Sequence, residues 1–335
     1  MDLESGYQRL LMRKKNAEKT VAITGASGYI GKHVIQEVQR LGEFEAKILT
    51  RSSFQKHESL CRNSNLDFYV GDLLNPKSLE GFLNTDCTVI NLAYSWQGGE
   101  AANLQMAKNL INECKDKGIR RLIHCSTVDV VGRASEDLVT EETPCRPATT
   151  YGVTKLNIEK IISEGGRGYF DVAILRPTFV FGPKGGPLKK LAGDMMGGGR
   201  VRNYLKSCLF GTRRMNLVSS THVVDAILFL TMYKNDLNGQ AFIVSDDDSP
   251  ANNFAEVERV LMEKLNIKKY SISKIPLPLS ILGLLLCSMG RNNTNPRRNY
   301  SSEKLRKLGF VPQVPFEVVL GEYAECCLES LSLAK

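Results

Sequence analysis

The chain has 335 residues, of which 42% are hydrophobic and 24% are charged, and its formal net charge is +8. This composition excludes a disordered or fibrous chain and leaves room for two domains. The basic residues are scattered and form no run of five, so we expect no nucleic-acid partner. Nine cysteines without metal-ligand spacing predict reduced thiols, no bound metal and a cytoplasmic protein.

Two segments bear on targeting. Residues 1–18 are polar and lack an apolar core, so they indicate a leader or a short surface helix ahead of the first strand and no secretory signal. The longest apolar stretch runs from Ile275 to Met289 and is shorter than the ~20 residues that span a bilayer. We therefore expect no membrane span. The stretch predicts a helix packed in a second lobe, with a shallow membrane or oligomer contact as the alternative.

Near the N-terminus, a short apolar run is followed by regularly spaced glycines and a helical pattern. Residues 21–23 predict a buried strand, and Gly25, Gly28 and Gly31 follow it at three-residue intervals. Apolar residues at helical spacing continue to Val38. A strand, a glycine turn and a helix form the arrangement that holds a dinucleotide pyrophosphate at the helix N-terminus.

The end of the second predicted strand, residues 46–50, bears on the choice of cofactor. An acidic side chain at this position bonds the ribose hydroxyls of NAD. Here Thr50 is followed by Arg51 and Ser52, and a guanidinium with hydroxyl neighbours suits a 2′-phosphate. The sequence therefore favours NADP, with NAD as the alternative.

Further strands are predicted at 67–70, 87–93 and 121–126, and a helix is predicted at 101–117. The first of these strands ends in Gly71-Asp72-Leu73, and Asp72 there can accept a hydrogen bond from an adenine amino group. Repeated alternation of strand and helix predicts a parallel, doubly wound, Rossmann-like α/β sheet.

Tyr151 and Lys155 lie four residues apart in a helical pattern that continues to about Ser163. This spacing places both side chains on one helix face. A free phenol has a pKa near 10, and a neighbouring ammonium group lowers that value by stabilising the phenolate. The pair therefore predicts a tyrosine that exchanges protons at neutral pH.

The chain resembles the extended short-chain dehydrogenase/reductase superfamily, which contains the NAD-dependent epimerase/dehydratase family of nucleotide-sugar enzymes. The resemblance spans about residues 20–183. The matching segments, in the superfamily's order, are Thr24–Gly31, Gly71-Asp72-Leu73, Asn91-Leu92-Ala93, Asn103, Asn109-Leu110, Ser126-Thr127, Val131-Gly132, Tyr151–Lys155, Arg176-Pro177 and Phe181-Gly182-Pro183.

This resemblance implies a role for each matching residue. Tyr151 is the expected acid/base and Lys155 its partner. Thr127, or Ser126 in its place, is the expected hydroxyl donor to the reacting oxygen. Asn103 is expected to have at least a structural role. The expected cofactor contacts are Gly25, Ser27, Gly28, Tyr29, Ile30, Gly31, Arg51, Ser52, Asp72, Leu73, Leu92, Ala93, Tyr94, Tyr151, Lys155, Pro177 and Thr178.

One departure from the superfamily narrows the reaction. Relatives that dehydrate nucleotide sugars carry Thr-Asp-Glu where this chain has Thr127-Val128-Asp129. Val128 cannot donate the proton that expels a hydroxyl group, so the sequence disfavours a 4,6-dehydratase.

The strand–helix alternation ends near residue 183. We expect a dinucleotide-binding domain at 19–183 and a smaller C-terminal α+β substrate lobe at 184–335, with a strand and helix at about 240–265 returning to the first domain. Basic residues gather between 200 and 214 and would contact a nucleotide diphosphate, or would be solvated. His222 is expected to be structural. The expected substrate residues are Arg200, Arg202, Arg213 and Arg214.

The leading expectation is an NAD(P)-dependent oxidoreductase that reduces the keto group of a nucleotide-linked sugar, with Tyr151 as acid/base. The alternatives are a nucleotide-sugar 4-epimerase with retained NAD, a hydroxysteroid-type alcohol dehydrogenase and a non-catalytic NADP-binding regulator. An intact Tyr151 and Lys155 disfavour the regulator. Homodimers are common in the superfamily, so a homodimer is a further expectation.

Overall fold

Seven parallel strands form the central sheet of the computed structural model, which describes residues 20–51, 65–134, 136–183, 185–186, 188–197, 199–289 and 295–332. The strand order is β10-β7-β5-β4-β1-β2-β3, so the order reverses between β1 and β4. This is the doubly wound, Rossmann-like sheet predicted from the sequence. The strands are β1 (Thr20–Thr24), β2 (Glu45–Thr50), β3 (Leu66–Val70), β4 (Thr88–Asn91), β5 (Arg121–Cys125), β7 (Asp171–Pro177) and β10 (Gln240–Val244).

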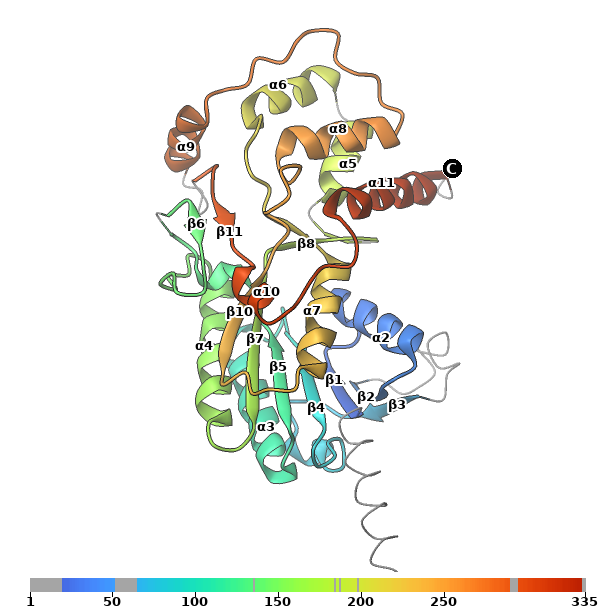
Figure 1. The fold of residues 1–335 in the computed structure, drawn as a ribbon, viewed down its shortest axis with the longest axis vertical. Helices are drawn as coiled ribbons and strands as arrows, with labels where there is room; N and C mark the ends of the chain where they lie inside the picture. Colours follow the sequence, from blue (N-terminus) through green and yellow to red (C-terminus); the bar gives the residue numbers. More distant parts are fainter. Residues whose placement is uncertain are drawn as a thin grey trace, which may run out of the picture. The chain divides into compact units, whose positions relative to one another are not determined.

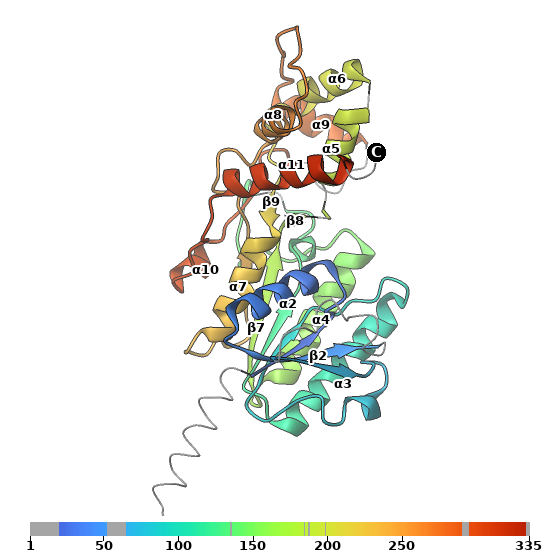
Figure 2. The ribbon, with the colours of Figure 1, turned by 90° about the vertical axis from the view of Figure 1, so that its right-hand side faces the viewer.

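Helices cover both faces of this sheet (Figures 1 and 2). Helices α3 (Gly99–Lys117) and α4 (Thr150–Gly166) lie on one face. Helices α2 (Tyr29–Leu41) and α7 (Ser220–Met232) lie on the other. The central strands are buried on both sides, as their unbroken apolar composition predicts. Leu110, Ile158 and Ile162 of α3 and α4 pack on Val89 and Leu122 of the sheet.

The chain folds into two compact units that interleave along the sequence. Of the described residues, unit 1 contains those up to Ser126 together with Val153–Leu175 and Ala226–Ala241, and unit 2 contains those in Thr127–Gly152, in Arg176–Asp225 and from Phe242 onward. The chain thus passes from one unit to the other several times, whereas the division expected from the sequence has a single main boundary at residue 183.

Unit 2 has its own apolar core, formed by helices α5 (Leu188–Gly197), α8 (Phe254–Lys264) and α11 (Phe316–Ser332). Val257 and Leu261 of α8 pack there with Leu320 and Tyr323 of α11. The strand at 240–244 joins the central sheet, but α8 does not accompany it, because the buried face of α8 belongs to this second core.

The smaller elements complete both units. Two short parallel pairs lie in unit 2, β6 (Leu138–Val139) with β11 (Asn299–Tyr300) and β8 (Phe179–Phe181) with β9 (Leu217–Ser219). The remaining elements are 3₁₀-helix η3 (Pro76–Leu79) in unit 1 and, in unit 2, η4 (Val128–Val130), α6 (Arg200–Phe210), α9 (Leu279–Ser288) and α10 (Glu303–Lys307).

The apolar stretch at 275–289 contains α9, of which Leu282 and Leu286 are buried. Ile281, Leu284 and Leu285 of the same helix are exposed to solvent. None of the helices in the described ranges has the length and apolar character needed to cross a membrane.

His222 is held inside unit 2 by both ring nitrogens. Nδ1 lies 2.6 Å from Oδ1 of Asp246, and Nε2 lies 2.7 Å from the carbonyl oxygen of Val314. Burial lowers the pKa of His222, but the Asp246 carboxylate and the Val314 carbonyl outweigh it, so the pKa is raised. Since both partners are acceptors, the protonated ring satisfies them both and ties together three segments of the chain.

Candidate active site

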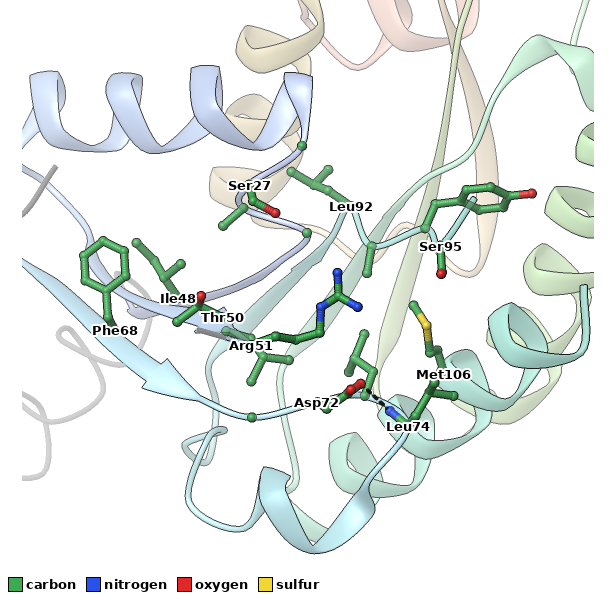
Figure 3. A pocket seen from close by; sticks show the side chains of 18 of the residues that line it. Ser27, Ile48, Thr50, Arg51, Phe68, Asp72, Leu74, Leu92, Ser95 and Met106 are labelled. Carbon is green, nitrogen blue, oxygen red and sulfur yellow. Dashed lines mark hydrogen bonds between the residues drawn. The ribbon is translucent and has the colours of Figure 1, made fainter. Parts of the chain in front are cut away.

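A cavity of about 510 Å³ opens in unit 1 at the carboxyl ends of β1, β2 and β4 (Figure 3). It lies where the strand order of the sheet reverses, which is where doubly wound sheets bind their ligands. The predicted cofactor residues that line it are Gly25, Ser27, Gly28, Arg51, Asp72, Leu73, Leu92, Ala93 and Tyr94.

The three glycines of the turn have different structural roles. Gly25 has φ +71°, and a Cβ atom there would lie 2.5 Å from the carbonyl carbon of Leu92. A Cβ atom on Gly31 would lie 2.4 Å from the carbonyl oxygen of Gly25. At Gly28 the nearest obstacle to a Cβ is that same oxygen, at 3.1 Å. Gly25 therefore permits the turn, Gly31 permits close packing of the helix, and Gly28 leaves open backbone beside the cavity.

Helix α2 begins at Tyr29, and its N-cap residue is Gly28. Among the described residues, no side chain caps this helix end, and the N-terminus of a helix suits an anion through its dipole. Tyr29, Ile30 and Gly31 form the first turn, and the described lining of the cavity does not include them. Because the glycine turn lines the cavity and leads into this uncapped helix end, the residues present fit the pyrophosphate of a dinucleotide.

The far end of the cavity carries the residues expected to contact the adenosine. Figure 3 shows the Arg51 side chain reaching from the end of β2 into the cavity. Oδ1 of Asp72 accepts a hydrogen bond from the backbone N–H of Leu74 at 2.9 Å, so this carboxylate is fixed at the rim. Ser52, the other residue expected here, lies outside the described residues.

A chain of buried polar side chains supports the Leu92–Tyr94 wall of the cavity. Oδ1 of Asn91 accepts hydrogen bonds from Thr24 Oγ1 at 2.7 Å and from Ala93 N at 3.3 Å. Nδ2 of Asn91 lies 3.1 Å from Nδ1 of His124. Burial lowers the pKa of His124 well below its usual value, so the ring is neutral and Nδ1 accepts this bond. His124 stands in an apolar strand and carries no functional signal in the sequence.

Ser95 and Met106 also line the cavity, and the sequence did not predict them. Ser95 is held by Asn103 of α3, whose Nδ2 donates to Ser95 O and whose Oδ1 accepts from Ser95 N, both at 2.8 Å. Asn103 thus has the structural role that was expected of it, because it fixes the loop that borders the cavity.

Lys155 lies in α4 and is only 4% exposed. Its Nζ donates a hydrogen bond to the carbonyl oxygen of Cys125 at 2.8 Å, and it lies 5.3 Å from the centroid of the Tyr94 ring. These two contacts place the ammonium group beside the wall of the cavity, at the carboxyl end of β5. Burial lowers the pKa of Lys155. Tyr151 is half-buried and precedes Lys155 by one turn of the same continuous helix.

In unit 2, Thr127 caps η4, and its Oγ1 accepts a hydrogen bond from Asp129 N at 3.2 Å. No acceptor is seen for the hydroxyl proton of Thr127 within the described part of the chain. A Cβ atom on Gly152 would lie 2.6 Å from the carbonyl oxygen of Asp129, so this glycine lets the start of α4 pack closely on the turn. Gly152 therefore fixes the backbone of Tyr151 against the segment that carries Thr127, a role missed in the sequence.

Two further predicted residues have buried hydroxyl groups. Ser126 Oγ, at the end of β5, has no hydrogen-bond partner among the described residues, and the same is true of Thr178 Oγ1 at the end of β7. Thr178 N donates to Val244 O at 3.1 Å, which fixes the backbone next to Pro177.

A family model described as the NAD dependent epimerase/dehydratase family matches residues 21–245. The chain belongs to this family. The match covers the glycine turn, the Tyr151/Lys155 helix and the strands of the sheet, so the resemblance seen in the sequence is confirmed.

The epimerase/dehydratase chain is similar to several characterised proteins. It is 25% identical to the sterol-4-alpha-carboxylate 3-dehydrogenase of Candida albicans, over 78% of this chain and 80% of the relative. It is also 25% identical to the UDP-glucose 4-epimerase of Vibrio cholerae, over 78% and 79%. The structure of the Bacillus anthracis dTDP-glucose 4,6-dehydratase in complex with NAD has a TM-score of 0.70 at 19% identity, over 93% of this chain and 97% of that one. This last likeness concerns the fold alone.

The four arginines expected to contact the substrate each have a partner within unit 2. Nη2 of Arg200 donates to the carbonyl oxygen of Lys269, and Arg202 lies 3.7 Å from Asp194. The guanidinium of Arg213 lies over the Phe210 ring at 5.6 Å. Nη1 of Arg214 donates to the carbonyl oxygen of Ser249 at 3.1 Å. Arg200 and Arg202 lie on α6, whereas Arg213 and Arg214 follow it.

Proposed function

We propose that this member of the epimerase/dehydratase family is an oxidoreductase that reduces the keto group of a nucleotide-linked sugar and prefers NADP. The observation that carries the proposal is the combination of a cavity lined by the glycine turn and Arg51 with a buried Lys155 one helical turn from Tyr151. The glycine turn would hold the pyrophosphate, and Arg51 would hold a 2′-phosphate.

Each residue then has a defined task. Lys155 holds a positive charge beside the cavity and favours the phenolate form of Tyr151. Tyr151 Oη gives its proton to the carbonyl oxygen in reduction and takes it back in oxidation. The hydroxyl group of Thr127 donates a hydrogen bond to the oxygen on which charge develops and keeps its proton. The nicotinamide ring, when bound, supplies or accepts the hydride.

The residue next to Thr127 argues against a dehydratase. The chain is 23% identical to the dTDP-D-glucose 4,6-dehydratase of mouse over 89% of its length. Val128 is 2% exposed and has no proton to donate. The proposed reaction therefore ends at hydride transfer, without loss of water from the sugar.

Replacement of Arg51 tests the preference for NADP. Arg51→Ala is expected to weaken NADPH binding by about 1–3 kcal/mol, the range of a hydrogen bond to a charged group, and to leave NADH binding nearly unchanged. The expectation rests on two observations. The Arg51 side chain lines the cavity, and neither position 50 nor position 51, at the end of β2, carries the acidic residue that would bind the ribose of NAD. Titration of both cofactors by fluorescence gives the two affinities. An equal loss for both would show that Arg51 does not bind the 2′-phosphate.

A ligand panel tests the substrate class. In the presence of cofactor, a nucleoside-diphosphate sugar is expected to raise the unfolding temperature, whereas a free sugar or a steroid is not. A ligand at a hundred times its dissociation constant adds about 2.7 kcal/mol to the apparent stability. The Arg213→Ala/Arg214→Ala variant should lose more of this shift than a Lys189→Ala/Lys190→Ala control, because two guanidinium groups suit a diphosphate.

The second candidate function is that of a hydroxysteroid-type alcohol dehydrogenase, and the opposite result of the ligand panel would support it. Two similar proteins are sterol-4-alpha-carboxylate 3-dehydrogenases, that of Candida albicans and that of mouse at 27% identity over 69% of this chain. Stabilisation by steroids with no effect of nucleotide sugars would assign this chain to that class. An epimerase is distinguished by NAD that copurifies with the protein and by interconversion of two sugar epimers without added cofactor.

A further inference from the structure

Large apolar side chains are exposed on three neighbouring segments of unit 2. Val201 and Leu205 of α6 are 72% and 60% exposed, Ile275 is 80% exposed, and Leu284 of α9 is 73% exposed. Clusters of exposed apolar residues of this kind mark surfaces that contact another apolar phase. The other members of the cluster are Ile272, Ile281, Leu285 and Met289.

The residues 266–278, named the strap here, join these segments into one region. The strap is attached to α6 about once per helical turn and continues directly into α9, and Figures 1 and 2 both show it running beside α6. The attachments are the hydrogen bonds from Arg200 Nη2 to Lys269 O, from Tyr204 Oη to Ser273 O at 3.0 Å, and from Leu277 N to Cys208 O at 2.8 Å.

Basic residues surround the same side chains. The sequence contains no Asp or Glu from 195 to 224 or from 264 to 302, and the exposed Lys268 and Lys269 lie in the strap. Among the described residues, carboxylates of other segments come close to the region. The exposed Glu263 of α8 precedes the strap and pairs with Arg259 at 3.2 Å. Asp194 pairs with Lys206 at 2.7 Å, and Glu258, only 1% exposed, pairs with Lys274 at 2.7 Å. The region thus combines exposed apolar side chains with exposed lysines.

We propose that α6, the strap and α9 form a membrane-surface contact that binds anionic lipid bilayers. The exposed apolar side chains would enter the boundary between headgroups and acyl chains, and the strap lysines would contact anionic headgroups. A helix of ten residues such as α9 can lie in this boundary without crossing it. The proposal is independent of the proposed catalytic function.

The charge of the region favours a lipid surface over a second copy of the chain. A two-fold interface brings the same patch of both copies together, so it would place the basic strap of one copy against that of the other. Like charges at such a contact repel, whereas an anionic bilayer complements them.

Flotation of the full-length protein with lipid vesicles tests the proposal. We expect binding to vesicles that contain phosphatidylserine, weaker binding to vesicles of phosphatidylcholine alone, and release at high salt, because screening weakens contacts between exposed charges. Ile275→Asp/Leu284→Asp should abolish binding. Lys268→Gln/Lys269→Gln should weaken it roughly 25-fold on the anionic vesicles, since each basic residue near the surface contributes about fivefold.

Matched controls separate the contact from general effects. Val311→Asp changes a side chain that is 68% exposed in the same unit but outside the region, and Lys77→Gln/Lys108→Gln removes two exposed lysines of unit 1. Both controls should bind vesicles like the wild type. Cofactor titration and circular dichroism should show that every variant is folded, as expected for changes at exposed positions.

Three results would overturn the proposal. The first is an absence of flotation with anionic vesicles at low salt. The second is equal binding by the Ile275→Asp/Leu284→Asp variant and the wild type. The third is a dimer, measured by sedimentation, that these two substitutions dissociate, which would assign the region to a second copy of the chain.

Discussion

Tyr151→Phe is expected to lower kcat by about 10²–10⁴-fold, the usual contribution of a positioned acid or base, while the affinity for the cofactor stays within a few-fold of the wild type. The phenyl ring keeps the packing of the first turn of α4 but has no proton to exchange. Single-turnover rates with the cofactor as chromophore measure the loss, and fluorescence titration measures the retained affinity.

Two comparisons sharpen this experiment. Tyr169→Phe removes the hydroxyl of a tyrosine that is 64% exposed in unit 1, and its kcat should not change. Lys155→Met should also lower kcat, and the double variant should be little worse than Tyr151→Phe alone, because residues that act as one unit are not additive. Near-normal turnover by Tyr151→Phe would remove this residue from the mechanism.

The parts of the fold that were predicted from the sequence depend on short-range rules. Gly25, Gly28 and Gly31 have distinct roles that follow from their order after a strand. Arg51 could be placed at the cavity because it directly follows β2, and the carboxyl ends of parallel strands meet at one edge of a sheet. The doubly wound sheet could likewise be predicted, because a repeated alternation of strand and helix is typical of parallel sheets.

What the sequence did not reveal depends on contacts between distant segments. Met106 shows no cofactor signal, because it reaches the cavity only through the packing of α3 beside the sheet. Gly152 cannot be distinguished from other glycines in the sequence, because its role depends on the carbonyl oxygen of Asp129, which lies 2.6 Å from the position of a Cβ atom. The periodicity of α8 identifies its buried face, but not that this face joins the core with α11.

Arg200 illustrates the same limit at the proposed substrate residues. Its charge and its place in a basic segment suit a diphosphate, yet its guanidinium contacts Lys269 O and lies 5.9 Å from the Tyr270 ring centroid. An arginine that anchors a loop and one that binds a phosphate have the same appearance in a sequence. The contact with the strap supports the first role for Arg200. Arg214 also donates to a backbone carbonyl, that of Ser249, so the ligand panel with the Arg213→Ala/Arg214→Ala variant has to decide between the two roles there.

Gly25→Ala is expected to abolish measurable cofactor binding and to destabilise unit 1. Two effects combine at this position. A φ of +71° costs a non-glycine residue about 1–2 kcal/mol, and the new Cβ would lie 2.5 Å from the Leu92 carbonyl carbon and 2.6 Å from Ala93 N. The backbone of Leu92 and Ala93 has to move, and both residues line the cavity. Urea unfolding and cofactor titration measure the two losses.

Gly118→Ala separates the steric clash from the backbone strain. Gly118 has φ +62° in the same unit, but no heavy atom lies within 4 Å of a Cβ built there. This control should lose about 1–2 kcal/mol of stability from strain and bind the cofactor normally. Gly25→Ala should lose roughly 1–3 kcal/mol more, the usual cost of overpacking. If both variants bound the cofactor equally well, the close approach of the turn to Leu92 would have no part in forming the site.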